Sequence, residues 1–350
     1  MIQLQHSLSA VPFNPEFRPA ARNAVTQCLR IQPDEKVTLI TDFACQEIAA
    51  AIASELESQG ILFNPFLLED LAPRPVTDMP KPVLDDMETS DVSIFAVRAQ
   101  KNELASRMQM TDVVNRRKMR HAHMVNIESR IMLEGMRADY HEVDRISTQV
   151  WQLASAAREI RATNPAGTNI IGRFTPAYKW LKTSGIISPN KWGNLPGGET
   201  FTTPLRVDGA FVIDGVVGDY LCEKYGDLAR TPLVIRVEDS RLMEAHSENK
   251  ELEEEFLRYC HTDENSDRVG EFAIGTNIGV HDVIGNILQD EKIPGIHIAF
   301  GNPYGAHTGA EWYSRTHIDV VGREFDIWID GLQIMHRGAF LLDSLPAPQV

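Results

Sequence analysis

The chain has 350 residues, 43% of them hydrophobic, so it is long enough for two domains with cores of their own and does not have the composition of a disordered chain. Its formal net charge of −15 at pH 7 disfavours binding to nucleic acid or to an anionic membrane surface. Four scattered cysteines without a Cys-x-x-Cys pair indicate a reducing compartment and argue against a structural zinc knuckle. With neither a secretory signal nor a long apolar stretch in the sequence, a cytoplasmic location is expected.

The N-terminal part of the chain has the pattern of a βαβ unit. Apolar positions at helical spacing predict a helix over residues 16–32, and a short β-branched run predicts a buried strand over 36–41. Asp42 stands at the expected N-cap of an amphipathic helix that Gly60 ends, and a second strand follows over 61–68. This order predicts a right-handed crossover with parallel pairing of the two strands.

A small doubly wound parallel sheet is therefore expected over residues 1–164. After a proline-rich loop, the sequence predicts a helix over 83–89, strands over 91–96 and 124–127, and a long helix over 140–162 that closes this α/β domain. The basic run at 116–120 is expected to lie on a solvated helix. Because Asp42-Phe43-Ala44 replaces the glycines of a dinucleotide fingerprint, nucleotide binding in the first βα turn is not expected.

Residues 165–350 have a different texture, in which short alternating runs are separated by glycine and asparagine. Asp214-Gly215 and Asp330-Gly331 predict hairpin turns, and only residues 241–259 and 279–288 predict helices. We expect a mostly antiparallel, barrel-like α+β domain here, and we expect it to bind metal. The predicted strands span residues 170–173, 209–217, 233–237, 272–275, 296–300 and 325–329.

The sharpest chemical signal is the His-x-Asp pair at His317 and Asp319. In a strand, side chains two residues apart lie on one face, so the two can reach one ion while Ile318 turns away. An imidazole with a carboxylate suits zinc, manganese, cobalt or iron better than calcium. Two neighbouring segments add further candidates, Glu271 in GEFAIGTN and His297 in DEKIPGIHIAFG.

Glu199 joins this set as a loop carboxylate in the segment NLPGGETFTTP. A Gly-Gly turn presents it in polar surroundings, where it has no obvious role in a core. Together, three carboxylates and two imidazoles can hold two divalent ions about 3.5–4 Å apart, with one carboxylate bridging them.

The four segments together resemble the thermophilic aminopeptidases T and S, a family of two-metal exopeptidases. The resemblance covers the whole chain loosely and residues 194–319 sharply. The chain is shorter than the long thermophilic members, and its Glu291–His297 interval is one residue longer than theirs, as in a divergent short branch of the family. The resemblance implies five metal ligands: Glu199, Glu271, His297, His317 and Asp319.

The resemblance also implies roles for two further residues, and it implies an activity. Glu291 corresponds to the acid/base glutamate, and Tyr304 corresponds to the tyrosine whose hydroxyl polarises the substrate carbonyl. The expected cofactors are two divalent ions of zinc, cobalt or manganese. The expected enzyme is a metallo-aminopeptidase that removes N-terminal residues from short peptides and forms a homodimer, as its relatives do. Neither nucleic acid nor membrane is an expected partner.

Each candidate also has a structural interpretation. His317 and His297 could be strand histidines of the core, and Glu199 an exposed loop carboxylate. Glu291 could lie in a solvated turn, and Tyr304 could serve only to pack a loop. Three other side chains are candidates for the pocket around the site: Asn277, Asp290 and His307.

Two other activities fit the same fold family. One is a ring-cleaving, single-iron dioxygenase of the 2,5-dihydroxypyridine type, in which apolar residues match Glu199 and His297 and a histidine matches Glu271. This chain has acidic and imidazole residues at those three positions, which favours two metals and hydrolysis. The other is a hydrolytic deaminase or amidase of a small aromatic compound. A binding protein with a decayed site is disfavoured by the intact ligand set.

Overall fold

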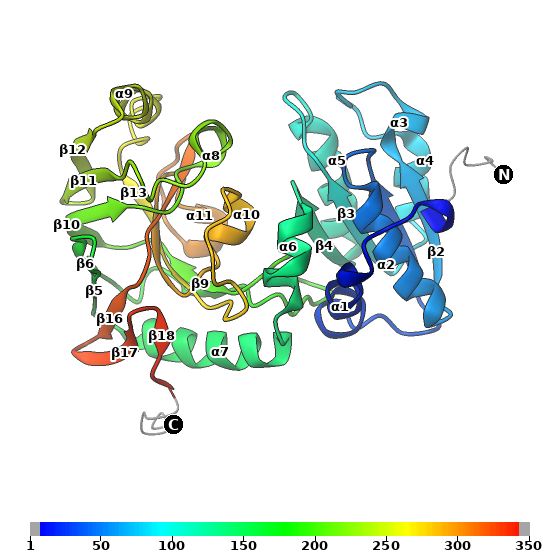
Figure 1. The fold of residues 1–350 in the computed structure, drawn as a ribbon, viewed down its shortest axis with the longest axis horizontal. Coiled ribbons are helices and arrows are strands. Elements are labelled where there is room, and N and C mark those ends of the chain that lie inside the picture. The colour runs from blue at the N-terminus through cyan, green and yellow to red at the C-terminus, as the bar shows by residue number, and fades with distance from the viewer. Residues whose placement is uncertain (1–7, 343–350) are drawn as a thin grey trace. The chain divides into compact units, whose positions relative to one another are not determined.

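The computed structural model describes residues 8–342 and divides into two compact units, shown in Figure 1. The first contains the described residues up to His141 together with Gly185–Gly197, and the second contains Glu142–Ser184 and the described residues from Gly198 onward. The expected domain boundary between residues 164 and 165 stays a prediction. Over residues 8–342, no helix is both long enough and apolar enough to cross a membrane.

The first unit is an all-parallel sheet with helices around it, as predicted, but it has five strands, and the fifth, β8 (Gly193–Asn194), was not predicted (Figure 1). Its strand order is β2 (Leu62–Leu67), β1 (Lys36–Thr41), β3 (Val92–Val97), β4 (Arg120–Val125) and β8 (Gly193–Asn194). A π-helical turn, Asn23–Cys28, follows α1. The α-helices are α1 (Arg18–Arg22), α2 (Gln46–Ser58), α3 (Leu68–Leu71), α4 (Lys81–Met87), α5 (Leu104–Arg117) and α6 (Ser129–Leu133).

The central strands β1 and β3 are buried on both faces, which explains their continuous apolar runs. Ile40 of β1 and Phe95 of β3 pack in one cluster with residues of α4 and α5. Their chain neighbours Leu39 and Ile94 are also buried, and strand alternation directs them to the opposite face.

Asp42 is not the N-cap of α2, contrary to the prediction. The N-cap is Cys45, and the buried Asp42 carboxylate instead accepts hydrogen bonds from the backbone N–H groups of Cys45 and Arg98 and pairs with Arg74. The guanidinium of Arg74 also binds Glu69 and Glu103. The turn that carries a phosphate in dinucleotide-binding folds is therefore occupied here by a buried ion-pair network.

Two predicted helices in this part of the chain end earlier than expected. The basic run is split, because α5 ends at Arg117, Lys118 is left-handed (φ 53°), and Arg120 begins β4. The long helix α7 (Tyr140–Ala156) also stops short, and Glu159–Thr163 forms β5. In β5 the buried residues Ile160 and Ala162 alternate with more exposed ones, which is a strand pattern.

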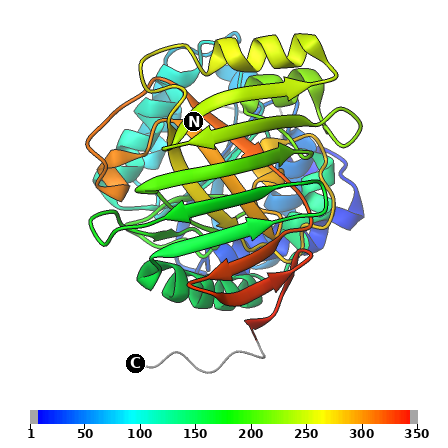
Figure 2. The same ribbon diagram turned by 90° about the vertical axis from the view of Figure 1, so that its left-hand side faces the viewer.

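The second unit contains two antiparallel sheets, which confirms the predicted change to a mostly antiparallel domain. Figure 2 shows the larger sheet face-on, with α9 (Lys250–Tyr259) along its β12 edge. Its eight strands run in the order β12 (Arg241–Ser247), β11 (Leu233–Glu238), β10 (Arg206–Ile213), β6 (Asn169–Arg173), β5, β16 (Asp326–Ile329), β17 (Leu332–His336) and β18 (Ala339–Phe340).

The smaller sheet has five strands and carries the chemistry described below. Its order is β15 (His317–Val321), β14 (Gly295–Gly301), β13 (Val269–Gly275), β9 (Glu199–Thr202) and β7 (Leu181–Lys182). Three short helices complete the unit: α8 (Asp219–Tyr225), α10 (Ile287–Asp290) and α11 (Gly305–Thr308).

One hydrophobic core joins the two sheets of the second unit. Phe211 and Ile235 from the larger sheet, Phe272 and Ile298 from the smaller sheet, and Val150 from α7 all belong to it. Each is at most 1% exposed. Because this core takes one face of the smaller sheet, every second residue of β13, β14 and β15 points away from it.

Three predictions in this unit are wrong in detail. Residues 241–247 form strand β12 rather than helix, since a tight turn with left-handed Asp239 and Ser240 folds them back on β11. Within residues 279–288 only the start of α10 is helical. Asp214-Gly215 is not a hairpin turn, because α8 lies between β10 and β11, whereas Asp330-Gly331 does join β16 to β17.

Candidate metal centre

The candidate centre lies on the face of the smaller sheet that points away from the core. On β15, Ile318 and Val320 are fully buried in the core cluster, so His317 and Asp319 point to the other face. On β14, Ile296 and Ile298 belong to the core, so the side chain of His297 between them points to the same outer face as His317 and Asp319.

The strand register brings the remaining two ligand candidates to the same face. Glu271 of β13 pairs with Ala299, which in turn pairs with Asp319. Glu199, the first residue of β9, pairs with Gly275, two residues beyond the partner of His297. Four strands thus contribute side chains that are far apart in the sequence to one patch.

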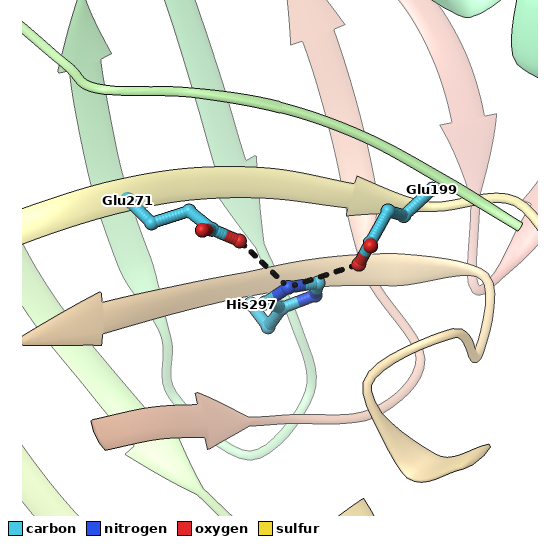
Figure 3. A group of neighbouring side chains, drawn as sticks. All are labelled: Glu199, Glu271 and His297. Carbon is cyan, nitrogen blue, oxygen red and sulfur yellow. Dashed lines mark ion pairs between the residues drawn. The ribbon is translucent and has the colours of Figure 1, made fainter. Parts of the chain in front are cut away.

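Glu199, Glu271 and His297 form the first group of possible ligands (Figure 3). The Nε2 atom of His297 lies 3.4 Å from Oε1 of Glu271 and 3.6 Å from Oε2 of Glu199. This nitrogen is buried and has no hydrogen-bond partner among the described residues. A buried imidazole nitrogen without a partner is costly, and a bound cation would satisfy it.

Glu271, His317 and Asp319 form a second group. Nε2 of His317 lies 3.3 Å from Oδ1 of Asp319 and 3.7 Å from Oε2 of Glu271. Glu271 therefore directs one carboxylate oxygen toward each histidine. This is the arrangement expected of a carboxylate that bridges two ions.

Glu291 lies beside both groups and forms a third with His297 and Asp319. In each of the three groups the candidate ligand atoms lie within 4.8 Å of one another. The structure thus brings together all five predicted ligands and the predicted acid/base residue. Their individual roles stay predictions.

Hydrogen bonds fix the orientation of two ligand candidates. Nδ1 of His317 lies 3.0 Å from the carbonyl oxygen of Asn302, which can only accept, so Nδ1 carries the proton and Nε2 is left to bind a cation. Thr183 donates its hydroxyl to Oε1 of Glu199 at 2.9 Å. The sequence analysis missed both Asn302 and Thr183, because a backbone carbonyl and a distant hydroxyl leave no local pattern.

Lys292 is the third residue that was missed. Its ammonium is 2.7 Å from Oε1 of Glu199 and pairs with Oε1 of Glu291, and its side chain is only 2% exposed. The sequence places it beside Glu291 in a segment that reads equally well as a solvated turn. Only the tertiary fold shows that the segment is buried.

The pKa values of the site follow from burial and from the crowding of charges. Burial lowers the pKa of His317, but Asp319 and then Glu271 outweigh it and raise the pKa to about 10. Burial raises the pKa of Glu291; the Lys292 ammonium opposes that rise, while Asp319 and Glu199 add to it. A carboxyl group with a raised pKa is suited to exchange protons near neutral pH.

The predicted pocket residues lie in different surroundings. Tyr304 is left-handed (φ 50°) and 41% exposed, and its ring centroid is 4.5 Å from that of His317. The buried Asp290 accepts hydrogen bonds from the N–H groups of Ile284, Gly285 and Asn286, so its role is to fold the loop that precedes Glu291. Asn277 is buried and caps Gly279 through its side-chain oxygen, and His307 is exposed on α11.

The donor set fits divalent cations of the first transition series. Four carboxylates face a single ammonium, and without an ion the His317 imidazolium, whose pKa is raised to about 10, balances one more charge. When both histidines are neutral, as metal ligands must be, three buried negative charges have no protein cation. Uncompensated buried charge is strongly unfavourable, and imidazole with carboxylate is a ligand set for zinc, manganese, cobalt or iron. The gaps of 3.3–3.7 Å between the facing ligand atoms of each pair are too long for good hydrogen bonds.

Residues 138–323 match the family model described as thermophilic metalloprotease (M29), which spans every residue of the candidate centre. The fold is similar to that of 2,5-dihydroxypyridine dioxygenase from Pseudomonas putida KT2440 (TM-score 0.66, 13% identity, covering 95% of this chain and 97% of that one). It is also similar to AmpT from Thermus thermophilus (TM-score 0.65, 17% identity, covering 93% and 99%). No curated protein sequence gives a significant match.

Proposed function

Because the chain belongs to the thermophilic metalloprotease (M29) family, we propose that it is a metal-dependent aminopeptidase that removes N-terminal residues from short peptides. The observation that supports this most strongly is the Glu271 carboxylate, whose two oxygens face His297 and His317 separately. A bridging carboxylate with a further acid and a histidine on each side is the ligand set of a two-metal hydrolase. We propose two divalent ions as cofactors, with zinc, cobalt or manganese as the candidates.

The ligand residues have distinct roles in this proposal. Glu199 and His297 would hold one ion, His317 and Asp319 would hold the other, and Glu271 would bridge them. Divalent ions bound in this way supply a water nucleophile at neutral pH and polarise the substrate carbonyl.

The remaining steps belong to Glu291 and Tyr304. Glu291 accepts a proton from the attacking water and transfers it to the leaving amine, for which its raised pKa is suited. The phenol of Tyr304, whose ring packs against His317, donates a hydrogen bond to the developing oxyanion. Partial burial and the neighbouring carboxylates, Glu271 first, raise the pKa of Tyr304, so it remains protonated and able to donate.

Release of amino acids from dipeptides tests the proposed activity. Purified protein stripped with a chelator should release no amino acid, and cobalt, zinc or manganese should restore the release. N-acetylated dipeptides should be resistant, because an aminopeptidase needs the free α-amino group. Hydrolysis of the acetylated dipeptides at a comparable rate, or no peptide hydrolysis with any of the three metals, would contradict the proposal.

A ring-cleaving dioxygenase is the second candidate, because the fold is as similar to 2,5-dihydroxypyridine dioxygenase as it is to AmpT. His297 and His317 with one carboxylate would provide a two-histidine, one-carboxylate site for a single iron. Glu199 and Glu271 supply more carboxylates than such a site needs, which favours the hydrolase. Oxygen consumption with dihydroxypyridine by the iron-loaded protein would decide for the dioxygenase. Ammonia release from small aromatic amines or amides would decide for a deaminase or amidase.

We propose further that the protein acts as a cytoplasmic homodimer on small substrates. The support for the dimer is the family resemblance, and the support for the location is the four scattered cysteines, none in a Cys-x-x-Cys pair, which suit a reducing compartment. Light scattering during size-exclusion chromatography should give twice the chain mass of 39.2 kDa. A mass equal to that of one chain would contradict the dimer.

A further inference from the structure

Lys292 supplies the one ammonium among the described side chains of the candidate centre, and direct ion pairs with two of the carboxylates hold it. Its side chain is 2% exposed, whereas lysines normally keep the ammonium in water. Burying an ammonium is strongly unfavourable unless ion pairs compensate it, so a lysine in this position is held there by specific partners.

Those partners are one predicted ligand and the predicted acid/base residue. Nζ of Lys292 is 2.7 Å from Oε1 of Glu199 and also contacts Oε1 of Glu291. A single ammonium therefore connects a carboxylate of the ligand set to the carboxylate that moves the proton.

The ion pair with Lys292 also gives the two carboxylate oxygens of Glu199 different partners. Oε1 receives Lys292 and the hydroxyl of Thr183, while Oε2 faces Nε2 of His297 at 3.6 Å. With Oε1 occupied in this way, Glu199 has one oxygen left for an ion.

The backbone around Lys292 holds the ammonium in place. The N–H of Lys292 donates to the carbonyl of Gln289 at 2.8 Å, and its own carbonyl accepts the N–H of Asn277 at 3.0 Å. Gly275 of β13 lies directly against this segment, since an added Cβ there would be 2.0 Å from the carbonyl oxygen of Ile293. The main chain from which the Lys292 side chain extends is thus anchored from β13, α10 and the loop after β13.

We infer that Lys292 is a positioning residue that ties the acid/base Glu291 to Glu199 and restricts Glu199 to a single ligand oxygen. Two consequences follow. Loss of the ammonium lets Glu291 rotate away from its productive position, which slows turnover. The same loss removes a fixed positive charge beside the ions and frees the second oxygen of Glu199, which tightens metal binding.

The test compares Lys292→Met with Lys224→Met. Lys224 also pairs with two glutamates, Glu251 and Glu255, but at the surface and away from the centre, so it controls for the loss of a paired lysine. Cobalt(II) is titrated into each apo protein and followed by its visible absorption, and kcat and KM are measured on a dipeptide. Lys292→Met should bind cobalt roughly tenfold more tightly and lose about 10²-fold in kcat at nearly unchanged KM, while Lys224→Met should match the wild type.

Only the kinetic part of this inference rests on the proposed function. Unchanged or weaker cobalt binding by Lys292→Met would overturn the restriction of Glu199, and an unchanged kcat would overturn the positioning of Glu291. A wild type that hydrolyses no peptide would refute the proposed function, and the cobalt titration would still decide the role of Lys292. If Lys292→Met does not fold, Lys292→Gln, which keeps a neutral donor, takes its place with the same expected results.

Discussion

At the scale of single residues, the candidate centre is a problem of excess negative charge. Glu199, Glu271, Glu291 and Asp319 are all at most 15% exposed, and Lys292 is their one directly paired ammonium among the described residues. Divalent cations would resolve this excess and would bind Nε2 of His297, which has no hydrogen-bond partner among the described residues. Burial, together with the negative charges of Asp319 and Glu199, raises the pKa of Glu291, so the proposed metal binding and proton transfer would have a common electrostatic origin.

Glu291→Gln separates a ligand role from an acid/base role at this position. The amide keeps the shape of the side chain but cannot accept the proton, so kcat should fall by about 10²–10⁴-fold while the metal content stays at the wild-type level. Steady-state kinetics on a dipeptide and elemental analysis of the same preparation check this, with the exposed Glu264→Gln as the control. Loss of metal along with activity would instead make Glu291 a ligand.

At the scale of elements, strand alternation made part of the centre predictable. His317 and Asp319 are two residues apart on β15, so their common face follows from the sequence. The placement of Glu199 could not be derived locally, because it depends on the register between β9 and β13. Residues 241–247 were mistaken for helix because the turn at Asp239 and Ser240, which makes them a strand, is not encoded by glycine.

The start of β9, which places Glu199 in the centre, requires a glycine at position 198. Its φ is +127°, and an added Cβ would lie 2.6 Å from Cβ of Asn277 and 2.8 Å from its backbone nitrogen. Gly198→Ala should therefore lower the free energy of unfolding by about 2–4 kcal/mol and weaken metal binding, because β9 must shift away from Asn277. Gly331→Ala, at a left-handed position with open space, should cost only about 1 kcal/mol and leave metal binding unchanged. Equal effects of the two substitutions in denaturant melts would contradict this account.

The loop that leads into β15 should make stability depend on pH. Partial burial raises the pKa of Asp263, but the N–H groups of Arg315 and Asn265 and the hydroxyl of Ser314 outweigh it and hold the pKa at about 2, below the ordinary value of 3.8. The unfolded chain therefore takes up the proton first as pH falls, so the stabilisation is complete above about pH 4 and is lost toward pH 2. The carboxylate is 21% exposed, and we expect a contribution of about 1–2 kcal/mol.

Asp263→Asn tests this contribution. The stability gap between wild type and variant should be largest near pH 5 and should shrink by about 1–2 kcal/mol between pH 4 and pH 2. Urea unfolding of the two proteins across that range measures it. A gap that stays constant with pH would show that the Asp263 charge does not hold the loop.

At the scale of the whole molecule, the change from a parallel α/β unit to antiparallel sheets follows from hydrophobic pattern alone. Runs such as that of β3 are buried on both faces, whereas β6 and β11, both predicted as strands, alternate between buried and more exposed residues. The residue bounds of the two units could not be predicted from the sequence, because Gly185–Gly197 returns to the first unit after the chain has entered the second. The family match over residues 138–323 includes all the candidate ligands, and the similarity to AmpT extends over 93% of the chain.

The central claim is that five side chains on four strands hold two divalent ions with Glu271 between them. Elemental analysis of cobalt-reconstituted protein after gel filtration tests it most directly. We predict about two ions per chain for the wild type, about one for His317→Ala, and none retained by Glu271→Ala, because this last substitution removes a ligand from both groups. A single ion in the wild type that both variants retain would contradict the account.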